Sequence, residues 1–275
     1  MCDDAIVRHA HEEARRMSRR KAIGVAAGVA TGISAAVVAG MGVSAQAHAA
    51  PGPAVSAGGH RRVVDLTHTL SPSFPVWPGE PPLVTIPTSR VGPGNSGFST
   101  NYVSFAEHSG THVDAPSHKI GDGITVDRID PADLVAPLVV ISIASKVRGN
   151  PRATLTERDI AEWEKAHGQI PRGALVALHT GWQPKTGGAH AAAYSADAVG
   201  TLVTERRVVA IGTDTLSVDL VDETGAHTAI LGSGRYAVEA MANLDSVPAV
   251  GATVMVGAPR FAGGTGGPAR VLALV

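Results

Sequence analysis

The sequence predicts a single α/β domain with a mixed, strand-rich core over residues 61–275. Eight short runs are rich in branched apolar residues, and most are continuously apolar, as in strands covered on both faces. Glycine (32 residues) and proline (18) are frequent, which favours many tight turns over a long helical bundle. The expected strands are 61–67, 83–86, 101–105, 138–143, 174–179, 208–212, 253–256 and 271–275.

Three segments carry helical patterns. The first would begin after Thr156, an N-cap residue with Asp159 three positions later, and would end at Gly168. The other two candidates are residues 195–206 and 235–243. No linker divides the chain after residue 60, so we expect these helices and the strands to form one domain.

Charge and cysteine content exclude several classes of protein. The 275 residues include 24 acidic and 23 basic side chains, for a formal net charge of −1, which gives no electrostatic basis for binding nucleic acid. The only cysteine is Cys2, so the domain has no disulfide framework, no cysteine zinc site and no cysteine nucleophile.

The first 49 residues have the pattern of an export signal. Residues 1–21 are polar and end in Arg19-Arg20-Lys21, an uncharged apolar run follows at 22–43, and Ala47-His48-Ala49 suits signal peptidase. The paired arginines resemble a twin-arginine signal. We expect cleavage after Ala49, export to the periplasm or the extracellular space, and no stable membrane association afterwards.

An uncleaved membrane anchor is the alternative, because the apolar run is nearly long enough to span a bilayer. Residues 50–60 are rich in proline, alanine, glycine and serine and are expected to be a flexible linker.

The densest group of metal-ligand residues lies within eleven positions. It contains His108, His112, Asp114 and His118. Neutral imidazole and carboxylate groups suit zinc, manganese or iron. Unrelated histidines on a polar loop are the alternative, and a zinc protease is excluded because the glutamate of His-Glu-x-x-His is missing.

The spacing constrains how these residues could meet. A helix is a poor host because Gly110 and Pro116 break it. In an extended chain His112 and Asp114 point to one face, but four extended residues would separate His108 from His112 by ~13 Å. We therefore expect the chain to turn at Gly110 and to change direction again at Pro116.

Two histidines and one carboxylate leave a metal ion short of ligands, so further donors are expected elsewhere. The candidates are His227, at the start of an apolar run, and Glu239, inside the apolar segment 236–241. Burying a carboxylate there is costly unless it is paired or bound to a cation. For Glu239 a solvated position on a helix is the alternative.

These residues resemble the cyclase family of metal-dependent hydrolases, which includes bacterial kynurenine formamidase and isatin hydrolase. The family's motif His-x-Gly-Thr-His-x-Asp-x-Pro-x-His is complete at residues 108–118, and the resemblance runs from about Val63 to Leu274. Trp77-Pro78-Gly79 and the eleven-residue spacing between His227 and Glu239 also match. The resemblance implies a swivelling β/β/α domain that forms a homodimer or a larger homo-oligomer.

The resemblance also implies two divalent ions at one site, zinc being expected and manganese or iron the alternatives. His108, His112 and Asp114 would bind the first ion. Asp114, His227 and Glu239 would bind or bridge to the second, with Glu239 reaching both.

The implied activity is that of an arylformamidase, which converts N-formylkynurenine to kynurenine and formate. His118 would act as the acid/base, and Trp77 would contact the aromatic substrate unless it only anchors its loop. Hydrolysis of a cyclic amide, lactone or ester, as by isatin hydrolase, is the first alternative, and a cyclase of secondary metabolism is another. A non-catalytic metal- or ligand-binding module is the alternative from a different class.

The sequence contains neither a serine-hydrolase motif nor a phosphate-binding loop. A serine hydrolase is disfavoured because the chain has no Gly-x-Ser-x-Gly sequence. The glycine-rich stretch 263–267 lacks the ending of a phosphate-binding loop and is expected to be a flexible turn.

Overall fold

The structure is a computed structural model that describes residues 62–94, 97–184 and 192–275. The expected export signal and linker lie outside these residues. Within the described ranges no helix combines the length and apolarity that crossing a bilayer requires.

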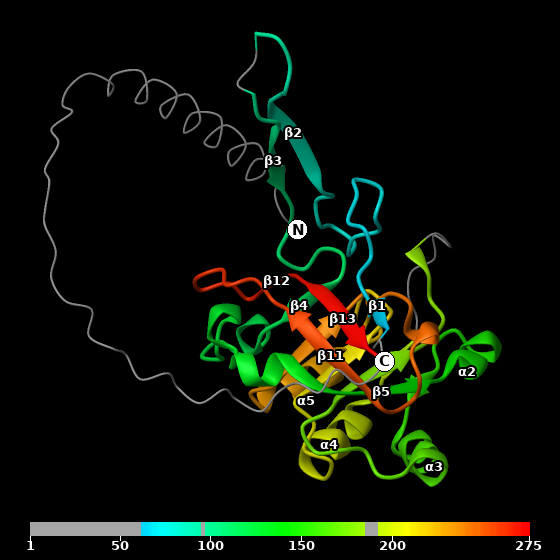
Figure 1. The fold of residues 1–275 in the computed structure, drawn as a ribbon. Helices are drawn as coiled ribbons and strands as arrows, with labels where there is room; N and C mark the ends of the chain where they lie inside the picture. The colour runs from blue at the N-terminus through cyan, green and yellow to red at the C-terminus, as the bar shows by residue number, and fades with distance from the viewer. Residues whose placement is uncertain (1–61, 95–96, 185–191) are drawn as a thin grey trace, which may run out of the picture. The chain divides into compact units, whose positions relative to one another are not determined.

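In the described residues, nine strands form one mixed sheet in the order β1-β13-β11-β5-β7-β9-β10-β4-β12 (Figure 1). The adjacent strands β5, β7, β9 and β10 run parallel, and antiparallel pairs flank them on both sides. Two two-stranded sheets, β2-β3 and β6-β8, complete the described strands.

The bounds of the strands are β1 Val63–Asp65, β2 Val84–Ser89, β3 Thr100–Ser104, β4 His112–Asp114, β5 Val135–Ser142, β6 Thr154–Leu155, β7 Leu175–His179, β8 Ala193–Tyr194, β9 Ala210–Thr213, β10 Tyr236–Glu239, β11 Ala252–Gly257, β12 Gly266–Pro268 and β13 Arg270–Leu274. The helices are α2 Ala144–Gly149, α3 Glu157–His167, α4 Ala196–Thr204 and α5 Gly225–Gly232, with 3-10 turns at Pro116–His118, Val126–Arg128, Pro131–Leu134 and Leu244–Ser246.

One face of the sheet is covered by helices, as Figure 1 shows for α3 and α4. Trp163 of α3, Leu202 of α4 and Ile230 of α5 pack in one buried cluster with Val139 and Val176 of the sheet. Alternate residues of the same strands point the other way, because side chains alternate along a strand.

The second face closes on the sheet's own flanking strands. Leu138 and Ala177 of the central strands share a buried cluster with Val254 of β11 and Val271 of β13. The sheet therefore curls around this cluster, and both of its faces are apolar, which explains the continuous apolar runs in the sequence. The finer assignment to a swivelling β/β/α domain stays a prediction.

Several predicted elements are confirmed with small shifts at their ends. All eight expected strands are present. Thr156 and Asp159 form the expected capping box of α3, and the helix ends at Gly168. Ser195 caps α4, which covers most of the expected segment 195–206.

Two predictions about local structure are wrong. The expected helix over 235–243 is the buried strand β10, which lies between β9 and β4. Pairing on both sides of the strand overrides any local helical preference. The glycine-rich stretch 263–267 is not a free turn, since Gly266 and Gly267 begin β12 and pair with Asp114 and Val113 of β4.

Candidate metal and active site

Two neighbouring strands bring the first three donors together. In the antiparallel pair β4-β10, His112 lies directly opposite Glu239, and Asp114 lies opposite Ala237. Opposed residues of an antiparallel pair share a face, so all three polar side chains point to the side that α5 covers. Val113 points the other way and is fully buried in the core.

Both expected bends are present and bring two more histidines to this point. Gly110 has a φ of +69°, which glycine adopts readily, and Pro116 begins a 3-10 turn that ends at His118. His108 Nδ1 lies 2.6 Å from Asp114 Oδ1, and the His108 and His118 ring centroids are 3.9 Å apart. The cluster 108–118 is therefore one site and not a loop of unrelated histidines.

His227 enters the site from the first turn of α5. The Asp219 carboxylate accepts hydrogen bonds from the backbone N–H groups of Ala226 and His227 and from His227 Nδ1. This leaves His227 Nε2 facing the carboxylates, 3.4 Å from Asp114 Oδ2 and 3.2 Å from Glu239 Oε1. Asp219 thus caps the helix and orients the imidazole.

Two potential metal-ligand atoms at the centre of the site have no hydrogen-bond partner among the described residues. His112 donates from Nδ1 to the Gly110 carbonyl, and its Nε2 lies 3.1 Å from Asp114 Oδ1 and 3.4 Å from Glu239 Oε2. His112 Nε2 and Asp114 Oδ2 are both buried and form no hydrogen bond, although each lies within 3.4 Å of an ionisable partner. Buried polar atoms are normally satisfied, so orphans beside two carboxylates fit a bound cation.

The donor atoms form two overlapping sets. His112, Asp114 and Glu239 offer ligand atoms within 4.8 Å of one another, and so do His108, Asp114 and His118. Asp114 belongs to both sets. These buried imidazole and carboxylate groups are suited to divalent metal ions.

The electrostatics of the site favour positive charge at its centre. Burial lowers the pKa of His112, but the Asp114 and Glu239 carboxylates outweigh it and raise that pKa to about 10. Burial likewise opposes the charge on His227, whereas Asp114, Asp219 and Glu239 raise its pKa to about 12. Burial raises the pKa of Asp114, yet the surrounding histidines hold it well below its usual value. Bound protons or metal ions can neutralise the negative charge of these carboxylates.

A cavity of about 290 Å³ opens onto these groups. His118 and Glu239 lie on its wall, together with Trp77, Leu216 and Val221, so polar groups face an apolar and aromatic surface. Burial lowers the pKa of His118, so its imidazole is neutral at pH 7 and can accept a proton. All seven residues singled out from the sequence thus lie at one place, while their individual roles stay predictions.

Sequence reasoning missed Glu107 and Thr265. The Thr265 hydroxyl donates to Glu107 Oε2 over 2.6 Å, since a carboxylate only accepts, and it lies 3.0 Å from His108 Nε2. Thr265 can therefore accept a proton from His108 Nε2, and the Nδ1 of that ring, which donates to Asp114 here, would then be free to bind a metal ion. The only local sign was the threonine among glycines at 263–267, which suggested a turn.

Asp214 is not part of the site's donor set. Its carboxylate accepts hydrogen bonds from the backbone N–H groups of Thr180 and Gly181 and from the Thr180 hydroxyl. It holds the turn after β7.

Comparisons with known proteins agree with this geometry. A family model described as "Putative cyclase" matches residues 64–220. Isatin hydrolase from Roseibium aggregatum is 32% identical over 246 residues, which cover 79% of this chain and 93% of that protein. Kynurenine formamidase from Salinibacter ruber is 27% identical over 220 residues, which cover 76% of this chain and 96% of that protein. The solved structure of isatin hydrolase A from Ralstonia solanacearum is 37% identical in sequence and superposes with a TM-score of 0.72. The match covers 78% of this chain and 92% of that one.

The fold and its buried histidines and carboxylates define a metal-dependent hydrolase. The chain belongs to the cyclase family, as the resemblance in the motif at 108–118 had suggested.

Proposed function

We propose that this hydrolase opens a cyclic aromatic amide of the isatin type. The observation that carries the proposal is the 32% identity to isatin hydrolase over nearly the whole of that protein, against 27–29% for kynurenine formamidases from three organisms. Hydrolysis of an aryl formamide such as N-formylkynurenine becomes the second candidate, because both bonds are amides and several formamidases are related to the chain.

The residues of the cavity suit the reaction. Trp77, Leu216 and Val221 offer a surface against which a flat ring can pack. A divalent ion, when bound by these ligands, would supply a Lewis acid that ionises water near neutral pH. His118 is placed to take up a proton as the oxygen of water bonds to the carbonyl carbon, and to pass it to the nitrogen as the C–N bond breaks.

We further propose two ions per site, with zinc the expected metal and manganese or iron the alternatives. The place of Asp114 in both donor sets supports this, because a shared carboxylate offsets the repulsion between two cations. Metal analysis of the purified protein tests the number and the identity of the ions.

The substrate is tested by comparing kcat/KM for isatin, N-formylkynurenine and a simple aryl ester on metal-loaded mature protein. We expect the highest value for isatin and loss of turnover after chelation. A higher value for N-formylkynurenine would replace the first proposal with the second. No hydrolysis of any of the three would contradict both.

We also propose that the protein is exported and that it forms a homo-oligomer. Its partner is proposed to be a small molecule and not a nucleic acid. The leader pattern up to Ala49 supports export by a twin-arginine route. Mass spectrometry of the protein recovered outside the cytoplasm tests it, with a mature N-terminus at Ala50 expected, and light scattering gives the oligomeric state.

A further inference from the structure

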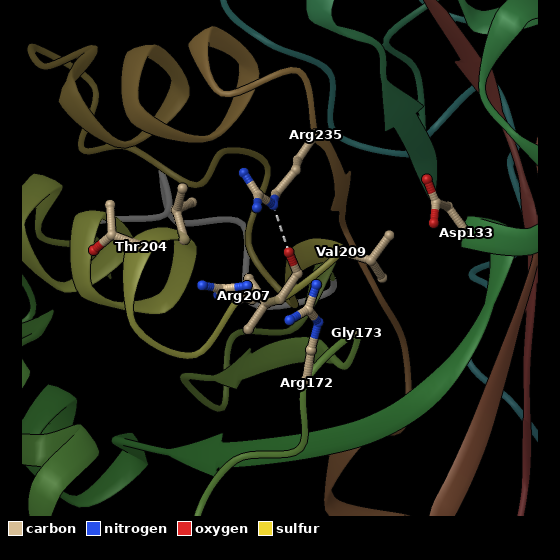
Figure 2. Close-up of a pocket in the computed structure, with 9 residues that line it drawn as sticks. Asp133, Arg172, Gly173, Thr204, Arg207, Val209 and Arg235 are labelled. Carbon is tan, nitrogen blue, oxygen red and sulfur yellow. Dashed lines mark hydrogen bonds between the residues drawn. The ribbon is translucent and has the colours of Figure 1, made fainter.

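A second, larger cavity lies at the opposite end of the parallel strands. It measures about 650 Å³, and three arginines, Arg172, Arg207 and Arg235, lie on its wall (Figure 2). These residues precede β7, β9 and β10, which are neighbours in the sheet. Because parallel strands all begin at the same edge, the topology gathers the three cations, whereas Glu239 lies at the far end of β10.

The three guanidinium groups have little to neutralise them. None of them forms an ion pair with another described residue, and Asp133 is the only carboxylate on the wall. Figure 2 shows the arginine head groups together in one part of the pocket, with Asp133 apart from them. Burial raises the pKa of Asp133, and the positive charge of Arg235 partly opposes that shift.

Two of the arginines are held in place by the backbone. Arg235 Nε donates to the Val208 carbonyl over 2.6 Å and its Nη1 donates to the Ser233 carbonyl over 3.4 Å, which leaves the Nη2 N–H groups for a ligand. Arg207 has a φ of +52°, in the left-handed region where glycine is usual after a helix. Its carbonyl accepts a hydrogen bond from Gly173 over 3.0 Å, which ties it to the residue that follows Arg172.

The C-terminus of α4 does not account for this charge. A cation near a helix C-terminus is favourable, but Arg206 already lies there and pairs with Glu164 and Glu205. Arg207 adds a second charge in a conformation that costs free energy for a non-glycine residue.

We propose that Arg172, Arg207 and Arg235 form a binding site for a small oxyanion, a phosphate or a dicarboxylate. Guanidinium groups recognise both through paired N–H donors, and three of them around one cavity suit an anion with more than one charged oxygen. The site is separate from the metal ligands and does not depend on the proposed hydrolysis.

Calorimetry with inorganic phosphate and, separately, with succinate tests the proposal on the metal-loaded protein. The test variant is Arg172→Gln/Arg207→Asn, because asparagine tolerates the left-handed conformation. The matched control is Arg148→Gln/Lys165→Gln, which removes the same charge from exposed positions elsewhere. The metal site is unchanged in all three proteins, so any anion bound there cancels in the comparison.

We expect at least one probe to bind the wild type and the control with similar Kd, and the test variant to bind it about tenfold more weakly or worse. Binding of phosphate but not succinate would identify a phosphoryl ligand, and binding of succinate but not phosphate would identify a dicarboxylate. Equal binding by the test variant and the wild type would overturn the site, as would failure of both probes to bind the wild type. Circular dichroism of the test variant confirms that it is folded.

Discussion

At the scale of single residues, three imidazoles share one arrangement. His112, His227 and His108 each have one ring nitrogen held, by the Gly110 carbonyl, by Asp219 and by Thr265 respectively. The other nitrogen of each ring faces Asp114. Fixing one nitrogen selects the tautomer, so the lone pair on the second nitrogen is directed to where a cation would lie.

The Thr265 hydroxyl is predicted to set the metal affinity through His108. Thr265→Val keeps the shape but removes the acceptor for His108 Nε2, so metal affinity should fall by roughly 10- to 100-fold. Thr265→Ser should restore it. Competition with a chromogenic chelator measures both variants, and an unchanged affinity in Thr265→Val would show that the hydroxyl does not orient the ring.

His118 is predicted to carry the proton and not to hold the metal. His118→Ala should lower kcat by roughly 10²- to 10⁴-fold while metal content stays at the wild-type level. Because His118 also belongs to one of the donor sets, metal content decides between the two roles. Loss of metal would make it a ligand, and full activity would remove it from the reaction.

At the scale of elements, the extended backbone that places His112 and Asp114 on one face, and the bends on either side of it, were predictable. The parity of His112 and Asp114, the left-handed glycine at position 110 and the turn at Pro116 follow from local chemistry. The capping box of α3 is local in the same sense. Such features need only neighbouring residues and so can be inferred from sequence.

The features that could not be predicted from the sequence depend on residues distant in the chain. Segment 236–239 is a strand because β9 and β4 pair with it, and the glycine-rich stretch 263–267 is ordered because β12 pairs with β4. Helix α5 was not expected at all, and it carries His227 to the site. Their apolar surroundings marked His227 and Glu239 as candidate donors, and resemblance to a family supplied their roles, whereas Glu107 and Thr265 needed the three-dimensional structure.

The edge strand β12 is predicted to require glycine at position 266. A Cβ there would overlap the Val113 carbonyl oxygen of β4 and would lie 2.6 Å from His108 Cε1. Gly266→Ala should therefore push β12 away from β4, displace the ring, weaken metal binding and destabilise the fold by about 1–3 kcal/mol. Gly200→Ala is the matched control, since its Cβ meets nothing within 4 Å in α4 and should stabilise the fold by about 0.5–1 kcal/mol. Urea unfolding measures both, and similar effects of the two changes would contradict the crowding at Gly266.

At the scale of the whole molecule, folding buries an excess of negative charge that protons or metal must balance. The raised pKa values of His112 and His227 mean that protonation of these residues stabilises the metal-free fold fully below pH 6.5. This contribution declines as the pH rises above 6.5 and is gone above the folded values of about 10 and about 12.

Metal binding is therefore predicted to release protons. Metal ligation needs neutral imidazoles, so at pH 7 up to about two protons should leave His112 and His227, and apparent affinity should rise with pH. Titration calorimetry in buffers of different ionisation enthalpy counts these protons. An affinity that does not change between pH 6 and 8 would show that these histidines are not the ligands.

The central claim is that the donors around Asp114 hold the divalent ions of a hydrolase. Metal content of the wild type and of Asp114→Asn, measured on protein purified in parallel, tests it most directly. Asparagine preserves the shape but removes the charge shared by both donor sets, so the variant should lose its metal while the wild type retains it. Equal metal content in the two proteins would contradict the claim.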